Sequence, residues 1–396
     1  MTERSIRMGV AGLGRAFTLM LPTFTADPRV SLIAATDLRA QARARFEKDF
    51  GARTYDTVEA LCADPEIEAV YVATPHQLHA KHVAVAAAKG KHVLVEKPMA
   101  VTLDECRAMI AAVRKAKVQL VVGHSHSFNA PILRSRELID NGVFGAVRMI
   151  HALNYTDYIV RPRRPEELDT AQGGGVLFSQ GSHQIDIVRL LGGGEVRSVR
   201  AHAGNWDASR PTEGAYSALL TFENGAFASC TYSGYAHFDS DEFLGWIGEM
   251  GLPKDPARYG AGRQALRAAS DANEEAAMKA ARNYGGANYA PSPAVAERHH
   301  QHFGTVIVSC ERADLRPVPD GVMIYDDRQT RLDPVPVPQV ARAEVIDELY
   351  AAVVQGKPPL HDGEWSRATL EVCLAILDSA QNQAEMTLRH QVGLRR

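Results

Sequence analysis

Residues 7–14 read Arg7-Met8-Gly9-Val10-Ala11-Gly12-Leu13-Gly14 and place a glycine pair directly behind a short apolar strand. Glycines at a strand-to-helix turn let the backbone approach a pyrophosphate, whose charge the N-terminus of the next helix favours. A tight turn alone would also need glycine, so the pair by itself is weak evidence. Its place between a predicted strand and a predicted helix favours a dinucleotide site. We therefore expect Gly12, Gly14, Arg15 and Ala16 to contact a coenzyme.

The pattern around this turn continues to about residue 124. Further apolar runs without alternation lie at residues 30–35, 69–73, 93–95 and 118–122, and helix-like stretches separate them. Such runs indicate parallel strands that are covered on both faces. The sequence therefore predicts an α/β fold with a doubly wound parallel sheet of the Rossmann type in residues 1–124.

The second part of the chain has a different pattern. Strand candidates at residues 196–203, 216–222 and 227–233 follow one another directly, and Glu223-Asn224-Gly225 is a hairpin signal. We predict an α+β domain over residues 125–396 with a largely antiparallel open sheet. Within it we expect a helical insertion at residues 253–283, a rigid Pro-rich connector at residues 334–338 and a C-terminal helix at residues 365–383.

Composition excludes several classes of protein. Of the 396 residues, 45% are hydrophobic and 23% are charged, which is typical of a globular chain. Lys plus Arg (44) nearly balances Asp plus Glu (47), so no basic excess indicates nucleic acid or an anionic membrane as partner. No apolar run approaches a membrane span, and residues 1–5 do not resemble a signal peptide. The five cysteines form no CxxC pair, which favours buried thiols in a reducing cytoplasm over disulfides or a zinc site.

Asp37 ends the second apolar run, where a carboxylate can accept hydrogen bonds from the adenosine ribose hydroxyls. Its charge would repel a 2′-phosphate, so NAD is favoured over NADP. Arg39 could soften that preference, so NADP stays possible. The third small position of the glycine fingerprint is Phe17, which would widen the packing of the helix on the sheet. The alternative interpretation is a tight turn followed by a capping Asp.

Two more predicted strand ends carry polar residues. One is followed by Thr74-Pro75 with His79, and the other by Glu96-Lys97-Pro98. A lysine beside a cationic nicotinamide should have a lowered pKa and can exchange a proton with a substrate hydroxyl. The alternative is a structural ion pair between Lys97 and a carboxylate such as Glu96. Pro98 could hold a cis or strained turn that directs Lys97.

In the second domain, Gly173-Gly174-Gly175 precedes a segment that contains Ser179, His183 and Asp186. His183 and Asp186 are three residues apart and would share one helix face. They could be an imidazole with its orienting carboxylate, or two ligand contacts. The alternative for His183 is a structural histidine at the start of a helix.

Taken together, these motifs resemble those of the Gfo/Idh/MocA oxidoreductases. The resemblance rests on the ordered set Gly12-x-Gly14, Asp37, Thr74-Pro75 with His79, Glu96-Lys97-Pro98, and Gly173-Gly174-Gly175 with Gly181-x-His183-x-x-Asp186. It implies hydride transfer between NAD(P) and a hydroxyl-bearing carbon, usually of a sugar or cyclitol. It also implies that Lys97 is the catalytic lysine, that His183 is its partner, and that Thr74, Pro75, His79 and Glu96 belong to the coenzyme site. An open sheet that builds homodimers or homotetramers is implied as well.

Two departures point away from an inositol-type site. Ser179 stands where the family usually has Asp, and residues 123–128 lack the usual Arg. These segments and the insertion resemble the 4,5-dihydroxyphthalate dehydrogenase-like branch, which oxidises carboxylated aromatic cis-dihydrodiols to catechols. A sugar or inositol dehydrogenase and a non-catalytic sensor of NAD and a metabolite remain alternatives.

A basic, proline-stiffened segment agrees with a carboxylated substrate. It contains Arg161, Arg163 and Arg164, whose guanidinium groups could bind a carboxylate in bidentate fashion. We include Tyr158 and His126 with Ser179, His183 and Asp186 as substrate contacts. A solvated basic loop is the alternative, and the sequence does not choose among the three arginines. The cluster His299-His300-Gln301-His302 has no evident third ligand, so we predict no metal.

Overall fold

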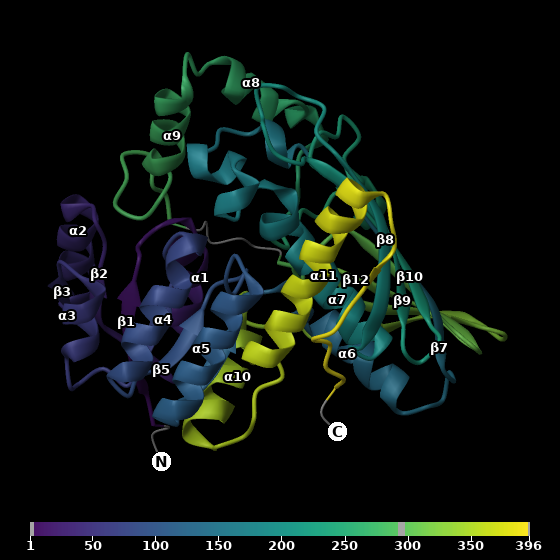
Figure 1. Ribbon diagram of the computed structural model, residues 1–396, viewed down its shortest axis with the longest axis horizontal. Helices are drawn as coiled ribbons and strands as arrows, with labels where there is room; N and C mark the ends of the chain where they lie inside the picture. Colours follow the sequence, from purple (N-terminus) through teal and green to yellow (C-terminus); the bar gives the residue numbers. More distant parts are fainter. Residues whose placement is uncertain (1–3, 292–297, 395–396) are drawn as a thin grey trace. The chain divides into compact units, whose positions relative to one another are not determined.

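The computed structural model describes residues 4–291 and 298–394 (Figure 1). The chain forms two compact units. Of the described residues, the first contains 4–124, 273–291 and 339–367, and the second contains 125–272, 298–338 and 368–394. Two segments that are distant in sequence therefore complete the N-terminal unit. One includes the end of the predicted insertion, and the other follows the Pro-rich stretch.

The first unit is built on a six-stranded parallel sheet with the order β3-β2-β1-β4-β5-β6. Its strands are β1 (Ile6–Ala11), β2 (Val30–Thr36), β3 (Arg53–Tyr55), β4 (Ala69–Val72), β5 (His92–Val95) and β6 (Leu120–Val122). Because β1 pairs with β4, the chain changes direction across the sheet between these strands. Ligands of open α/β sheets bind at the carboxyl ends of strands beside such a switch point. The glycine turn follows β1 at this place.

Helices connect the strands of this sheet. They are α1 (Arg15–Ala26), α2 (Ala40–Phe50), α3 (Val58–Ala63), α4 (His79–Ala88) and α5 (Leu103–Ala116). β4 is buried at every position, as expected for a strand that is covered on both faces. α5 begins with a capping box in which Thr102 and Glu105 bond each other's backbone. Two further helices, α9 (Ala272–Ala281) and α10 (Ala343–Val354), follow later in the chain.

The second unit contains a nine-stranded sheet with the order β14-β13-β12-β11-β7-β10-β9-β8-β15. Its strands are β7 (Val147–Tyr155), β8 (Val196–Gly204), β9 (Ala215–Phe222), β10 (Phe227–Ser233), β11 (Thr305–Cys310), β12 (Ala313–Val318), β13 (Gly321–Asp326), β14 (Thr330–Pro334) and β15 (Met386–Thr387). Only the β7–β10 pair is parallel among these described strands, and the other pairs are antiparallel. The predicted fold class is therefore confirmed.

One face of this sheet carries the helices α6 (Ala130–Asp140) and α7 (Ser182–Gly192), visible beside the strands in Figure 1. Every residue of α7 is buried. A π-helical turn at Leu177–Gly181 leads directly into it. The predicted insertion contains α8 (Ala261–Arg267) and α9 with non-helical chain between them, and the last helix is α11 (Gly363–Asn382).

The opposite face of the sheet exposes large apolar side chains. Along β10, Ala228, Cys230 and Tyr232 are buried, whereas Phe227 is 43% exposed. Phe227 pairs directly with Met149 of β7, which is 40% exposed, and Leu219 of β9 is 49% exposed. No helix in the described part of the chain is long and apolar enough to cross a membrane.

Candidate active site

The glycine turn after β1 has the geometry of a pyrophosphate site. Gly12 has a φ of +97°, and a Cβ there would lie 2.7 Å from the Ala73 carbonyl oxygen, so only glycine fits. Gly14 caps α1, and a Cβ added to it would meet no atom within 4 Å. This open space lies at the N-terminus of α1, whose first residues are Arg15 and Ala16. The turn therefore fits the phosphates of a dinucleotide.

Asp37 lies beside this turn at the end of β2. Its carboxylate accepts a hydrogen bond of 2.7 Å from the Leu13 backbone N–H and bonds of 2.8 and 3.0 Å from the N–H and Nε of Arg39. The predicted ribose-binding carboxylate and the phosphate turn are thus held together. Phe17 is fully buried against Phe46 of α2, so its bulk is accommodated between α1 and α2.

His79 joins the turn after β4 to the turn after β5. It is fully buried, and its Nε2 and Nδ1 lie 2.8 and 3.0 Å from the carbonyl oxygens of Thr74 and Pro98. The ring of His79 therefore positions these two turns, and the coenzyme contact that we predicted for it stays a prediction. Thr74 itself directs Oγ1 at His82, 3.0 Å away, and Pro75 begins the short turn that leads into α4.

The Glu96-Lys97-Pro98 turn is fixed at its first residue. Glu96 is buried, and its carboxylate accepts a hydrogen bond of 2.5 Å from the Tyr71 hydroxyl. Burial raises the pKa of Glu96 above its usual value, and the Tyr71 hydrogen bond and nearby cations reduce that effect. The peptide between Lys97 and Pro98 is cis. Glu96 thus serves to hold the turn, and the half-buried Lys97 follows β5 at the carboxyl edge of the sheet.

A second set of candidate residues meets within the second unit. We define the histidine–aromatic cluster as His126, His183, Tyr232 and Phe303. The two imidazoles lie 4.7 Å apart between ring centroids, and Phe303 lies 5.3 Å from His126 and 5.1 Å from His183. Tyr232 stacks on Phe303 at 6.0 Å. The structure therefore brings His126 and His183 together from the residues after β6 and from α7.

Glu249 is a site residue that the sequence did not reveal. Its carboxylate lies 3.2 Å from His126 Nε2, while the Asn129 amide lies 2.9 Å from His126 Nδ1 and donates to the Gln301 carbonyl. Since that amide donates to Nδ1, the ring proton is on Nε2 and points at Glu249. Burial alone would raise the pKa of Glu249, but His126, Arg161 and His302 outweigh it and lower the pKa to about 2. The loop that carries Glu249 has no motif that marks it in sequence.

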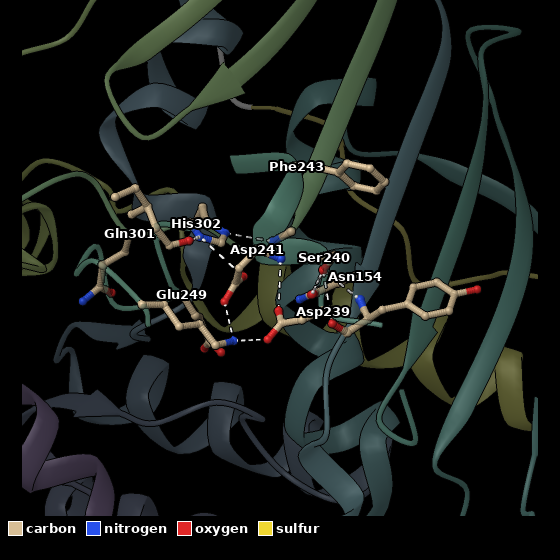
Figure 2. A network of polar contacts seen from close by, with 12 residues as sticks. Asn154, Asp239, Ser240, Asp241, Phe243, Glu249, Gln301 and His302 are labelled. Carbon is tan, nitrogen blue, oxygen red and sulfur yellow. Dashed lines mark hydrogen bonds and ion pairs between the residues drawn. The ribbon is translucent and has the colours of Figure 1, made fainter. Parts of the chain in front are cut away.

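Polar contacts hold this loop in place (Figure 2). Lys254 forms ion pairs with Asp239 and with Asp241, the second at 2.8 Å. Ser240 Oγ bonds the Asn154 side chain at 2.9 Å and the Tyr155 backbone N–H at 3.0 Å, which anchors the loop to the end of β7. These contacts therefore fix the position of the segment that carries Glu249.

The histidine cluster at residues 299–302 also holds neighbouring segments in place. His299 bonds Asp320 at 2.7 Å, His300 bonds the Val335 carbonyl at 3.0 Å, and His302 bonds the Ile247 carbonyl at 2.8 Å. These residues precede β11 and make separate contacts. Within the described residues, no group of three His, Cys, Asp or Glu side chains could hold a metal.

The three arginines have different surroundings. Arg163 is buried, stacks 3.5 Å from the centre of the Tyr158 ring and donates to the Tyr158 carbonyl at 2.7 Å. Arg164 lies 3.2 Å from Glu166. These contacts support the loop, and the predicted substrate roles of Tyr158, Arg163 and Arg164 stay predictions.

Arg161 differs from the other two. Its side chain is 46% exposed, and its Nε and Nη2 both lie 2.7 Å from Asp157 Oδ1. Its Nη1 makes no hydrogen bond within the described part of the chain. Partial burial lowers the pKa of Arg161, but the neighbouring Asp157, Tyr232 and Glu249 raise it by more. Arg161 therefore lies within electrostatic reach of Glu249 and of Tyr232 in the histidine–aromatic cluster.

Asp186 connects the segments that carry the two histidines. Its two carboxylate oxygens accept hydrogen bonds of 2.5 Å from Ser127 and 2.8 Å from Thr369. Asp186 is buried, and these two hydrogen bonds give it a positioning role; the predicted substrate contact stays a prediction. Ser179 is buried in the π-helical turn before α7.

Comparisons with known proteins agree with this geometry. Residues 6–124 match the family described as "Oxidoreductase family, NAD-binding Rossmann fold", and residues 132–251 match "GFO/IDH/MocA C-terminal domain". The chain is 48% identical, over 95% of both chains, to 1-carboxy-3-chloro-3,4-dihydroxycyclohexa-1,5-diene dehydrogenase of Comamonas testosteroni.

Two further similar proteins share a lower identity with this chain. A crystal structure of a protein from Bordetella bronchiseptica RB50, designated a dehydrogenase, superimposes with a TM-score of 0.91 at 40% identity and covers 97% of this chain and 100% of that one. Myo-inositol 2-dehydrogenase of Thermotoga maritima is 30% identical over 50% of this chain and 58% of that one. On this evidence the chain belongs to the Gfo/Idh/MocA oxidoreductase family and is a dehydrogenase with an NAD-binding Rossmann domain.

Proposed function

We propose that this enzyme oxidises a carboxylated cyclic cis-dihydrodiol to a catechol with NAD as the hydride acceptor. The observation that carries the proposal is Arg161, whose guanidinium is fixed by Asp157 and lies within electrostatic reach of Tyr232 in the histidine–aromatic cluster. A guanidinium beside flat aromatic rings suits a ring substrate with a carboxylate, because Arg binds carboxylates through parallel N–H donors. The relative from Comamonas testosteroni acts, by its name, on a carboxylated dihydroxycyclohexadiene.

The guanidinium of Arg161 keeps N–H groups available for a substrate. Asp157 holds Nε and one N–H of Nη2, which fixes the plane of the guanidinium and leaves Nη1 and the second N–H of Nη2 as the parallel donors for a substrate carboxylate. Tyr232 and Phe303 stack at 9° between ring planes and present apolar surface to a flat ring. A polyol has neither a carboxylate for Arg161 nor a flat apolar ring for Tyr232 and Phe303.

The residues that would hold NAD are Gly12, Gly14, Arg15 and Ala16 at the phosphates and Asp37 at the adenosine ribose. The bound nicotinamide supplies the acceptor for the hydride that leaves the hydroxyl-bearing carbon. We assign the hydroxyl proton to Lys97 Nζ and the supporting acid–base or binding role to His183. His126, whose Nε2 lies 3.2 Å from Glu249, is our further proposed substrate contact through the face of its ring.

The chemistry of such a product favours oxidation. Loss of hydride from carbon and of a proton from oxygen leaves a ketone in the ring. The ketone can tautomerise to a catechol, and aromaticity makes the reaction nearly irreversible.

A substrate panel tests the proposal. NADH formation at 340 nm would be compared for a benzoate- or phthalate-derived cis-dihydrodiol, its analogue without the carboxyl group, myo-inositol and hexoses. We expect the carboxylated diol to have a kcat/KM at least about 100-fold above the others, from a charge-assisted carboxylate contact of about 3 kcal/mol. Preferred turnover of myo-inositol would support the polyol alternative, and tight NADH binding without any turnover would support a sensor.

Arg161→Met should remove most of the preference for the carboxylated diol. The matched control is Arg148→Met, since Arg148 is an exposed arginine of β7 that pairs with Glu311 in the same unit. An unchanged preference in Arg161→Met would exclude Arg161 as the carboxylate contact.

We also propose that a second copy of this chain covers the exposed face of the nine-stranded sheet, to give a homodimer or homotetramer. Contiguous apolar surface of this kind is typical of an interface. A reducing cytoplasm is our proposed location, supported by five cysteines that are present as thiols.

A further inference from the structure

The chain segment after α9 packs tightly on the NAD-binding unit, although it lies far from it in sequence. Tyr284 is fully buried, and its ring contacts Phe17 at 5.3 Å and Phe46 at 6.5 Å between centroids. Its hydroxyl donates to Asp49 at 2.7 Å, and its backbone N–H donates to Thr18 at 3.0 Å. These four contacts belong to a single compact unit and fix Tyr284 between α1 and α2.

The carbonyl of Tyr284 reaches Arg39. Arg39 Nη1 donates to that carbonyl at 3.3 Å, and Nη2 donates to the Leu13 carbonyl at 2.8 Å. Nε and Nη2 also face the two oxygens of Asp37, at 3.0 and 3.2 Å. Each nitrogen of this guanidinium therefore has an acceptor within the protein, and the side chain is folded back onto the glycine turn.

Arg43, the next arginine, is also engaged. Its Nη1 donates to the Asp37 carbonyl at 2.6 Å, and its Nη2 lies 2.8 Å from Asp56. Recognition of a 2′-phosphate requires a cationic donor that can turn to the phosphate beside the ribose, and Arg is the side chain best suited to it. Arg39 and Arg43 are therefore engaged with acceptors of the protein and are not available to bind a 2′-phosphate. The Asp37 carboxylate stays in place.

We propose that the Tyr284 segment determines coenzyme choice: by holding Arg39 against Asp37 and Leu13, it keeps the adenosine site selective for NAD and against NADP. The selectivity of the Rossmann unit thus depends on a segment outside residues 1–124. Release of the segment should allow Arg39 to turn outward and pair with a 2′-phosphate.

Equilibrium titration of NADH and NADPH tests this proposal without any diol substrate, so its outcome is independent of the substrate proposed above. The wild-type protein should bind NADH more tightly than NADPH. In Tyr284→Ala the Kd for NADPH should fall about tenfold, equivalent to about 1.4 kcal/mol, while the Kd for NADH changes less than about threefold. Tyr284→Phe is the matched control, because it keeps the ring between Phe17 and Phe46 and should keep the wild-type ratio.

Two further variants complete the test. Gly285 has a φ of +73°, and a Cβ there would lie 2.9 Å from Ala42 Cα, so Gly285→Ala should displace the segment with a smaller loss of core. The gain in NADPH affinity should disappear when Arg39→Ala is added. Wild-type protein that binds both coenzymes equally, or an unchanged Kd ratio in folded Tyr284→Ala and Gly285→Ala, would overturn the proposal.

Discussion

The Asp186 carboxylate accepts a hydrogen bond of 2.5 Å from the Ser127 hydroxyl and thereby ties the helix of His183 to the turn of His126. Its other oxygen accepts from Thr369 of α11, which also receives a hydrogen bond of 2.8 Å from the buried Arg189. One buried carboxylate thus sets the spacing of two imidazoles without being part of the cluster that they form.

Replacement of this carboxylate by an amide should separate the two histidines. In Asp186→Asn one oxygen becomes an N–H₂ group that cannot accept a hydrogen bond, so a buried hydroxyl loses its partner. We expect a loss of about 1–3 kcal/mol in the free energy of unfolding and a lower kcat. Urea titration would measure the stability, with the exposed Asp314→Asn as control. Wild-type stability and kcat in Asp186→Asn would contradict the positioning role.

Lys97 should affect turnover and not coenzyme binding. If its amine carries the hydroxyl proton, Lys97→Met should lower kcat by about 10²–10⁴-fold, the usual contribution of general acid–base catalysis. The Kd for NADH should stay near the wild-type value. The control is Lys89→Met, which replaces an exposed lysine just after α4. An unchanged turnover number for Lys97→Met would remove this residue from the mechanism.

Much of this architecture follows from local pattern. The unbroken apolar runs predict five of the six parallel strands, and Glu223-Asn224-Gly225 predicts the β9–β10 hairpin, because both signals act between near neighbours. The sequence pattern does not predict β3, because its three residues are exposed or half-buried and form no apolar run. The parallel pairing of β7 with β10 is also not predicted, because strand order depends on contacts between segments that are distant in sequence.

The same distinction applies to the site. Gly12, Gly14 and Asp37 can be found from sequence, since their roles depend on the ends of adjacent strands. Glu249 cannot, because it meets His126 only through the folded loop. Arg161 and Arg163 are identical in type and nearly adjacent, and only the folded loop distinguishes them: Arg163 is buried and stacks on Tyr158, whereas Arg161 is half exposed and pairs with Asp157.

The Glu249 carboxylate should make stability depend on acid pH. Its pKa falls from an ordinary 4.5 to about 2 in the folded protein, so the folded state binds fewer protons than the unfolded state between these values. The stabilisation is complete above about pH 4.5 and is lost as the pH falls toward 2. Because the side chain is 37% exposed, we expect about 1 kcal/mol rather than the full linkage value.

Urea unfolding of wild type and Glu249→Gln at pH 7, 5 and 3 would measure this effect. The difference between the two proteins should shrink between pH 5 and pH 3. Glu223→Gln, in the exposed hairpin turn, is the control and should show no such trend. A difference that is constant with pH would mean that Glu249 is not held as a low-pKa carboxylate.

The exposed sheet face should mediate self-association. Phe227 lies directly beside Met149 in the register of β10 and β7, and Leu219 points to the same face from β9. A carboxylate at the centre of this patch would be buried without a partner in any assembly that covers it. Phe227→Asp should therefore shift the protein to a lower oligomeric state in light scattering after gel filtration. Val143→Asp, which replaces a more exposed apolar residue outside the sheet, should leave the mass unchanged. A wild-type protein that is already monomeric at micromolar concentration, or a Phe227→Asp variant with the wild-type mass, would exclude this face as the interface.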